Sequence, residues 1–274
     1  MDWTSILVAM DADPSCAMRL DLSCGLAAAF GARLVGVAAE PATPPPLADP
    51  MLGAVTTETL TVFREAAEAE LAGLKSAFLA AAATARLDTL WRGRAGYPAD
   101  VVKTEARTSD LIVMGRRSPL CDARAADPGD VLLGAGRPVL IVPPSPARDP
   151  LGAPAIVAWS DAGECRRAVA AALPLLKRAG PVSVVTVASA PDEARRDGVA
   201  EVADWLRRHG VEAGAEVRST HRDAAQELLQ LAEDRQAGLV VAGAYGHARL
   251  REWVMGGVTR SLLGQADVCV LMAH

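Results

Sequence analysis

The sequence predicts an α/β protein made of two open, parallel, five-stranded sheets in tandem, with helices on both faces of each sheet. Three observations support this prediction. Short apolar runs alternate with longer helical stretches, which is typical of a buried parallel sheet. The same order of elements occurs twice along the 274 residues. The chain is 51% hydrophobic but only 4% aromatic, so Ala, Val and Leu supply most of the apolar mass, as suits helices packed on such a sheet.

The first repeat starts with an apolar run at residues 6–11, which predicts a strand. A helix is expected from about Ser15 to Phe30, and a second strand at residues 34–38. A proline-rich segment, from Pro41 to Pro50, leads into a long helical stretch from about Thr56 to Ala83. We interpret this segment as a surface connection, although polyproline II geometry would also suit a partner that reads proline. Two later strands are expected at residues 110–115 and 137–142.

The second repeat follows the same order. A strand is expected at residues 155–159, a helix from about Glu164 to Arg178 and a strand at residues 182–187. The helical stretch that follows, about Pro191 to His209, is shorter than its counterpart in the first repeat. The last two strands are expected at residues 238–243 and 267–272.

A proline-rich join lies between the repeats, from Pro143 to Pro154. Proline ends the preceding strand and stiffens a linker. We therefore predict two domains, at residues 1–146 and 152–274.

Charge and cysteine usage exclude several classes of protein. The net charge is −5 and no basic block occurs, so nucleic acid is not expected as a partner. The cysteines are odd in number and form no C-x-x-C, so neither a disulfide framework nor a zinc site is predicted, and the four histidines are too scattered for a metal site. No signal peptide or membrane-length apolar run occurs, and a cytoplasmic protein without a membrane partner is expected. The cysteines, expected to be buried, are Cys16, Cys24, Cys121, Cys165 and Cys269.

The most informative stretch of the chain reads GAYGHARLREWVMGGVT, from Gly243 to Thr259. It follows an apolar strand and carries glycines three apart, at Gly243 and Gly246, and a glycine pair further on, at Gly256 and Gly257. Glycine lets backbone N–H groups approach a ligand closely. A glycine pair that leads into a helix adds free N–H groups and the positive end of the helix dipole. This order predicts a phosphate-binding loop, with a structural turn as the alternative.

The spacing G-x2-G-x9-G, together with Tyr245-Gly246-His247 and Met255 to Arg260, resembles the nucleotide loop of the universal stress protein family. The resemblance covers essentially the whole chain as a tandem pair. It implies the adenine nucleotide alpha-hydrolase-like fold and pairing of domains through their last strands, here within one chain, with a further homodimer left open. It also implies that ATP or a related adenine nucleotide binds, with or without Mg²⁺.

The resemblance places the nucleotide in the second repeat. Phosphate contacts are expected from the glycine loop, with Thr259 as the hydroxyl because Gly257 stands where the family pattern has Ser or Thr. Val187 is expected near adenine and ribose, and Ser160 or Asp161 at the family's acidic position after the first strand. The full expected set is Ser160, Asp161, Val187, Gly243, Gly246, His247, Gly256, Gly257, Val258 and Thr259.

The first repeat departs from this pattern. Arg116 and Arg117 follow Gly115 where a second glycine is expected. Later, residues 127–130 read Asp-Pro-Gly-Asp, and Pro128 removes a backbone donor while the two carboxylates repel phosphate. Asp11 would suit a ribose hydroxyl. We predict a degenerate site here, or a site for a different anion in which the arginine pair replaces backbone donors.

No catalytic residues are predicted. The sequence has no Walker A string, no nucleophile elbow and no base beside a nucleophile, so any ATP hydrolysis should be slow. Three functions remain open. They are a nucleotide-binding stress or regulatory protein, a ligand-free module that binds unknown protein partners, and, with least support, an enzyme of adenylyl or phosphoryl transfer.

Overall fold

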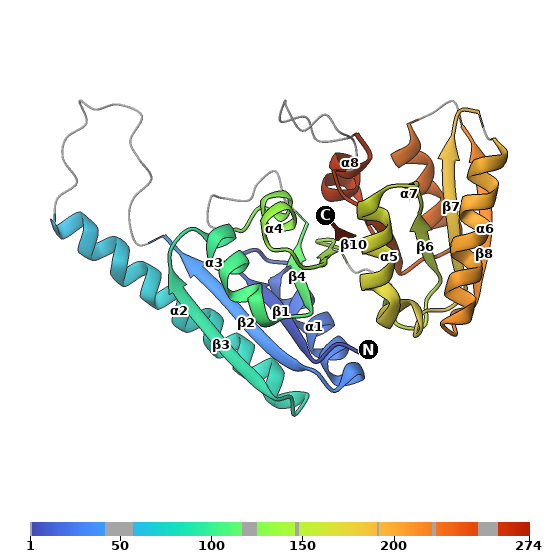
Figure 1. Ribbon diagram of the computed structural model, residues 1–274. Helices are drawn as coiled ribbons and strands as arrows, with labels where there is room; N and C mark the ends of the chain where they lie inside the picture. The colour runs from blue at the N-terminus through green and yellow to red at the C-terminus, as the bar shows by residue number, and fades with distance from the viewer. Residues whose placement is uncertain are drawn as a thin grey trace, which may run out of the picture.

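The computed structural model describes residues 2–41, 57–116, 125–145, 148–190, 192–220, 223–245 and 257–274. Strands and helices alternate along both halves of the chain (Figure 1). The first half contains β1 Ser5–Met10, α1 Cys16–Phe30, β2 Arg33–Glu40, α2 Thr57–Thr84, β3 Thr89–Ala95, α3 Pro98–Glu105, the 3-10 helix η2 Ala106–Thr108, β4 Leu111–Gly115, α4 Pro128–Gly134 and β5 Val139–Val142.

The second half repeats that order, as the sequence predicts. Its elements are β6 Ala155–Ala158, α5 Gly163–Leu176, β7 Val182–Ala188, α6 Glu193–Arg208, β8 Ala213–Ser219, α7 Ala224–Asp234, β9 Leu239–Gly243, α8 Gly257–Gln265 and β10 Cys269–Ala273.

The strands form one ten-stranded sheet in the order β3-β2-β1-β4-β5-β10-β9-β6-β7-β8. Pairing is parallel within each half. The halves meet at β5 and β10, which pair antiparallel with Leu140 opposite Leu271. The predicted α/β class is therefore confirmed. The two five-stranded sheets join edge to edge through their last strands into a continuous sheet.

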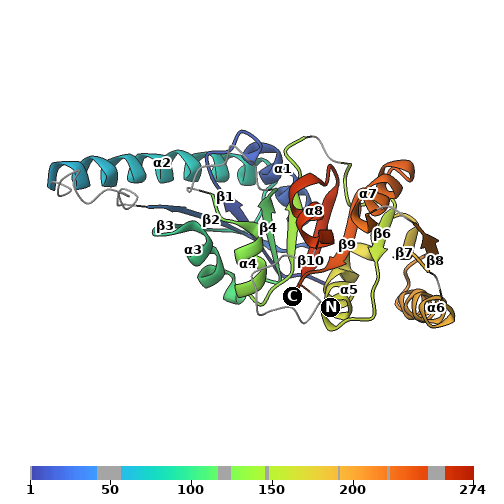
Figure 2. The same cartoon turned by 90° about the horizontal axis from the view of Figure 1, so that it is seen from above.

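Each face of the sheet carries helices from both halves. Helices α1, α2, α5 and α6 contribute to one hydrophobic cluster, and α3, α4, α7 and α8 to the other, so each cluster crosses the junction between the halves. Figure 2 shows α2 and α3 on opposite sides of the first strands. The core is aliphatic, with Ile6, Leu140 and Leu271 among its fully buried side chains. Burial of such side chains stabilises the fold by about 1.5–3 kcal/mol each.

Polar contacts also cross the junction. Arg178 follows α5 in the chain. Its guanidinium lies 4.2 Å from the centroid of the Phe30 ring on α1 and donates to the carbonyl of Ala29. On the other side, Arg116 donates to the carbonyl of Ala266 at 2.9 Å and to the carboxylate of Asp267 at 3.1 Å. Arg116 therefore links the two halves through hydrogen bonds. The alternative in which Arg116 binds an anion in the first half does not fit this geometry. Arg117 lies outside the described residues.

Several smaller predictions concern single residues. Asp223 precedes α7 and caps it by accepting from the backbone N–H of Ala225, as expected for an N-terminal helix residue. The four described cysteines, Cys16, Cys24, Cys165 and Cys269, are buried as predicted, and burial raises the pKa of Cys269 to about 12. Cys121 and most of the proline-rich segment lie outside the described residues. Within the described part of the chain, no helix is long and apolar enough to cross a membrane.

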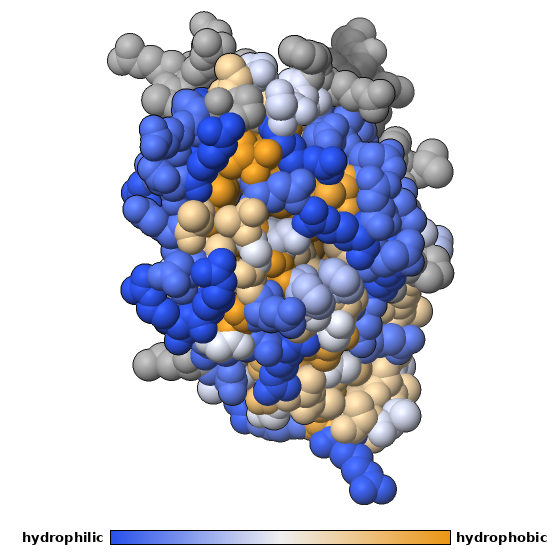
Figure 3. Space-filling view, turned by 90° about the vertical axis from the view of Figure 1, so that its right-hand side faces the viewer, coloured by the Kyte–Doolittle hydropathy of each residue, from blue (hydrophilic) through white to orange (hydrophobic). Residues whose placement is uncertain are grey.

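The two ends of the sheet differ in their surroundings. Helix α2 extends beyond the sheet edge (Figures 1 and 2) and carries exposed apolar side chains, among them Val62 at 63% exposure. The opposite end, formed by α6 and β8, is covered mostly by hydrophilic residues (Figure 3). Charged side chains on an edge strand discourage pairing with another chain, and β8 carries Glu216 and Arg218.

The carboxylate of Asp110 fastens the start of β1 to the start of β4. It accepts from Thr4 N at 2.7 Å, from Thr4 Oγ1 at 2.9 Å and from Ser5 N at 3.1 Å. Burial raises the pKa of Asp110, but these hydrogen bonds outweigh burial and leave the pKa lowered. Asp110→Ala should therefore reduce the free energy of unfolding by about 1–2 kcal/mol at neutral pH, measured by urea denaturation.

The pH dependence of this loss gives a second readout. Because the folded pKa of Asp110 is below its unfolded pKa, the stabilisation is present above the unfolded pKa of about 4 and is lost as the pH falls through the folded pKa. The difference between parent and variant should shrink in that acid range. Asp88→Ala, which removes the partner of an exposed Arg33 ion pair, is the control and should cost less. A constant difference at all pH values would contradict the assignment.

Candidate functional site

The candidate site lies at the carboxyl ends of β6 and β9, where the strand order of the second half reverses. Ala158 at the end of β6 pairs with Ala242 on one side and with Val185 on the other. This register brings three sequence-predicted positions, Ser160, Val187 and Gly243, to the same edge of the sheet. They come from separate parts of the chain, and the sheet alone brings them together.

Gly243 ends β9 beneath the first turn of α5. A Cβ at this position would lie 2.6 Å from the backbone N of Cys165 and 2.8 Å from both Cys165 Sγ and Glu164 Cγ. With contacts this short, a side chain would force the start of α5 to shift. Glycine is therefore required here because a helix packs closely on the strand end, which is a reason that the sequence does not reveal.

The turn after β6 carries Ser160 and Asp161, both exposed. The hydroxyl of Ser160 lies 3.2 Å from Cys165 Sγ. The backbone carbonyl of Ser160 accepts from Ala162 N at 2.7 Å, so the turn packs against the start of α5. Asp161 forms an ion pair with Arg166. Ser160 occupies the position of Asp11 in the first half, as the strand registers show, so the sequence-expected acid at this place is a hydroxyl.

Helix α8 begins at Gly257, next to the end of β9. No described atom lies within 4 Å of a Cβ built on Gly257, so space is open at the start of this helix. Thr259 is buried, and its hydroxyl accepts from Tyr245 N at 3.5 Å, which joins the two described ends of the glycine loop. Val258 and Val187 pack against the same hydrophobic cluster. Gly246, His247 and Gly256 lie outside the described residues.

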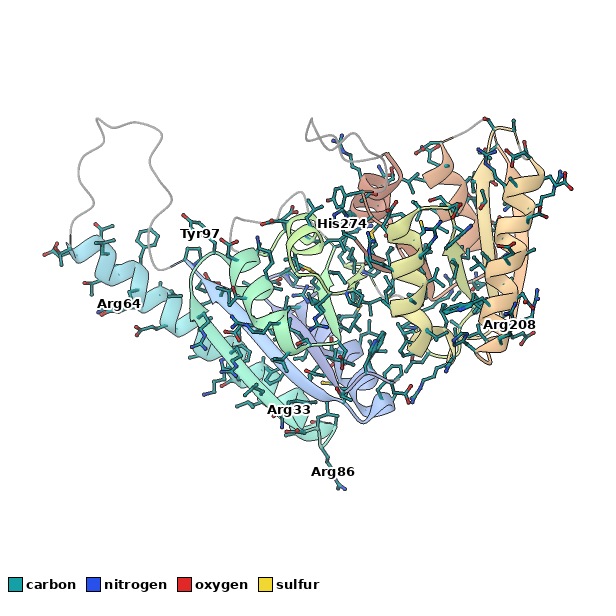
Figure 4. The ribbon with its side chains drawn as sticks, viewed as in Figure 1. Arg33, Arg64, Arg86, Tyr97, Arg208 and His274 are labelled. Carbon is teal, nitrogen blue, oxygen red and sulfur yellow. The ribbon has the colours of Figure 1, made fainter. Side chains whose placement is uncertain are left out.

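Two residues that sequence reasoning missed close this end of the site. Tyr245 has a positive φ of 63°, and its hydroxyl is buried with no hydrogen-bond partner among the described residues. Burial raises the pKa of Tyr245, and the carboxylates of Asp127 and Asp130 in the first half raise it further. The terminal residue His274, near the junction of the halves in Figure 4, lies edge-on to the Tyr245 ring at 5.9 Å and 3.2 Å from the carbonyl of Ala244.

The equivalent crevice in the first half is filled by its own side chains. Arg19 on α1 is buried, with its side chain 2% exposed, and its guanidinium donates to Asp11 at 2.8 Å. A Cβ on Gly115, at the end of β4, would collide with this guanidinium. The ion pair thus occupies the space between the ends of β1 and β4. In the second half the position of Arg19 is taken by Ala168.

The helix that follows this crevice is also closed. Asp127 caps α4 by accepting from Asp130 N at 3.0 Å, and Pro128 is the first residue of the helix. An internal carboxylate therefore satisfies a donor that a phosphate would need, and the proline removes another. Both features leave fewer free donors at this helix end, and the degenerate site of the first half stays a prediction.

The described residues show no group of three or more His, Cys, Asp or Glu that could hold a metal ion. Among the described residues of the crevice, Ser160, Asp161 and Glu164 carry side-chain oxygen atoms of the kind that bind Mg²⁺. Cys165 was expected to be buried but not to contact Gly243 and Ser160, and its alignment with Cys16 in the repeat gave a usable signal. Arg19 gave a weaker one, as a charge within an otherwise apolar helical stretch.

Comparisons with known proteins agree with this architecture. Residues 154–274 match the Universal stress protein family model. No curated protein matches the chain in sequence. A universal stress protein from Archaeoglobus fulgidus has a similar structure, with a TM-score of 0.73 and 16% identity over 98% of this chain and 97% of that one. A candidate universal stress protein from Pseudomonas aeruginosa has a TM-score of 0.59 and 17% identity over 99% of this chain and 93% of that one. At these identities the two structures show a common fold, which extends over both halves.

The packing at Gly243 predicts a specific loss of stability. Gly243→Ala should lower the free energy of unfolding by about 1–3 kcal/mol, because its methyl group meets the backbone of Cys165. Gly214→Ala on β8, where a Cβ has no atom within 4 Å, is the matched control and should be nearly neutral. Equal stabilities of the two variants in urea denaturation would show that the start of α5 moves without cost.

The ion pair in the first half predicts a non-additive mutant cycle. Arg19→Met leaves Asp11 without its partner and should destabilise the protein by about 3–5 kcal/mol. The double variant Asp11→Ala with Arg19→Met removes both charges and should recover most of that loss. Additive losses in chemical denaturation would mean that the two side chains do not act as a pair.

Proposed function

We propose, on the premise that residues 154–274 belong to the universal stress protein family, that this half of the chain binds an adenine nucleotide, with ATP as the expected form. The nucleotide would lie over the carboxyl ends of β6 and β9. The protein would act in a stress response as a regulator whose shape or partners depend on the bound nucleotide.

The observation that carries this proposal is the contrast between the two crevices of one chain. In the first half, Arg19 fills the crevice and Asp127 caps the following helix. In the second half, Ala168 replaces the arginine, and the start of α8 at Gly257 has open space around it. Among the described residues, no side chain fills the second crevice as Arg19 fills the first, and the start of α8 would attract an anion, which supports the proposal.

Different residues of the crevice would contact different parts of the nucleotide. The backbone N–H groups of Gly257 and Val258 at the start of α8 would donate to phosphate oxygens. Val187, partly buried at the end of β7, would offer an apolar surface to the adenine or ribose. The Ser160 hydroxyl would replace the usual acid near the sugar. Gly246, His247 and Gly256 stay predictions for the phosphate loop.

Regulation rather than rapid turnover suits these groups. The hydroxyl and carboxylate groups nearest the expected phosphates include two that already have partners. Thr259 is engaged with Tyr245 N, and Asp161 with Arg166. Bound ATP should consequently persist or be hydrolysed slowly.

A second candidate function is a ligand-free module that binds other proteins. Two observations favour it. Close packing against α5 explains Gly243 without a ligand, and the buried hydroxyl of Thr259 is used within the loop. The exposed apolar residues of α2, Leu60 and Val62, would then belong to a protein-binding surface.

Calorimetric titration with ATP and Mg²⁺ distinguishes these candidates, after any co-purified nucleotide has been removed and identified by mass spectrometry. We expect one site per chain in the parent. Gly257→Asp should weaken binding by at least about tenfold, because a carboxylate at the start of α8 repels phosphate while the open space accommodates the side chain.

Gly264→Asp is the matched control, since it adds the same charge to α8 at a position with equally open space. Its affinity for ATP should stay close to that of the parent, and thermal unfolding should confirm that both variants fold. Absence of nucleotide binding by the stripped parent would favour the protein-binding module. Equal losses in both variants would remove the start of α8 from the site.

A further inference from the structure

A second concave site lies at the far end of the sheet, on the edge strand β3 and beside the 3-10 helix η2. This pocket has a volume of about 290 Å³ and is lined by Arg92, Arg94, Glu105, Arg107 and Thr108. Five strands, β2, β1, β4, β5 and β10, lie between β3 and the crevice at the ends of β9 and β6. The pocket is therefore independent of the proposed nucleotide site.

The pocket carries more positive than negative charge. Glu105 is the one acid among the described lining residues, and it pairs with both Arg92, at 3.6 Å, and Arg94, at 3.2 Å. Arg107 donates through Nε to the carbonyl of Thr104 at 2.8 Å. No carboxylate among the described residues pairs with the Arg107 guanidinium. Two of the three guanidinium groups thus share one carboxylate, and the third has none.

The second half provides an internal comparison, because its strand registers give equivalent positions. Arg92 in β3 corresponds to Glu216 in β8, and Arg107 to Arg235, each four residues before the next strand. In the second half, Arg235 pairs with Glu216 and donates to Ser183. The first half has kept the arginine but carries Arg92 in place of its carboxylate partner.

A second pairing strengthens the contrast. Arg218, the equivalent of Arg94, pairs with both Glu216 and Glu227. Two arginines therefore meet two carboxylates in the second half, whereas three arginines meet one in the first. The same scaffold is neutral at one end of the sheet and cationic at the other, so the surplus of charge is not a requirement of the fold.

We propose that the pocket of Arg92, Arg94, Arg107 and Thr108 binds a small anion that carries phosphate groups, with pyrophosphate as the simplest representative. The guanidinium group is planar and donates in pairs to phosphate oxygens. The Thr108 hydroxyl adds a neutral donor. Glu105 holds Arg92 and Arg94 in place from one side and leaves their remaining N–H groups for the ligand.

The test is a titration of pyrophosphate into ¹⁵N-labelled protein, followed by the Nε–Hε resonances of the arginines. These resonances are assigned from single variants. Arg92, Arg94 and Arg107 should shift together with one dissociation constant. Arg92→Glu copies the charge pattern of the second half and should weaken binding by at least about tenfold, as expected for loss of hydrogen bonds from a charged donor.

Arg64→Glu is the matched control, because Arg64 is an exposed arginine on α2 of the same half and the change in net charge is identical (Figure 4). Its affinity should equal that of the parent. Arg107→Ala is the second variant if Arg92→Glu unfolds. Absence of shifts at millimolar pyrophosphate would overturn the proposal. So would binding that resists both pocket variants but is lost in Gly257→Asp, because the anion would then lie in the nucleotide crevice.

Discussion

The antiparallel pairing of β5 with β10 is the interaction on which the rest of the structure depends. Each half has only parallel pairs internally and would otherwise expose the edge of its last strand. Pairing of β5 with β10, in which Leu140 lies opposite Leu271, satisfies the backbone hydrogen-bonding groups of both edges and joins ten strands into one sheet. The hydrophobic clusters on both faces then run across the junction, and the outer edges at β3 and β8 are the ends of a shared core.

This arrangement lets one chain carry two versions of the same crevice. The first is occupied by the Asp11–Arg19 pair, and burial of these charges is tolerated because each compensates the other. The second has Ser160 and Ala168 at the equivalent positions, so the buried ion pair of the first crevice has no counterpart at these two positions. A repeat that has filled one site with its own side chains can keep its structural role, and the proposed ligand binding then falls to the other site.

The sequence predicted the alternation of strands and helices well, because apolar runs and repeat symmetry are local signals. The helix expected from Ser15 begins at Cys16, and that expected from Thr56 begins at Thr57. The sequence did not predict that the Arg19 side chain points into the crevice, because nothing in the sequence gives the direction of a helical side chain relative to the sheet. The close packing of Gly243 on Cys165 and the unbalanced arginines of β3 likewise depend on contacts between segments distant in the chain.

A crystal structure of the chain with an ATP analogue and Mg²⁺ tests the central claim most directly, namely that only the second crevice accepts a nucleotide. We expect one nucleotide per chain, over the ends of β6 and β9, with its phosphates at the start of α8 and the Asp11–Arg19 pair undisturbed. A nucleotide over the ends of β1 and β4, with Arg19 displaced from Asp11, would contradict the claim.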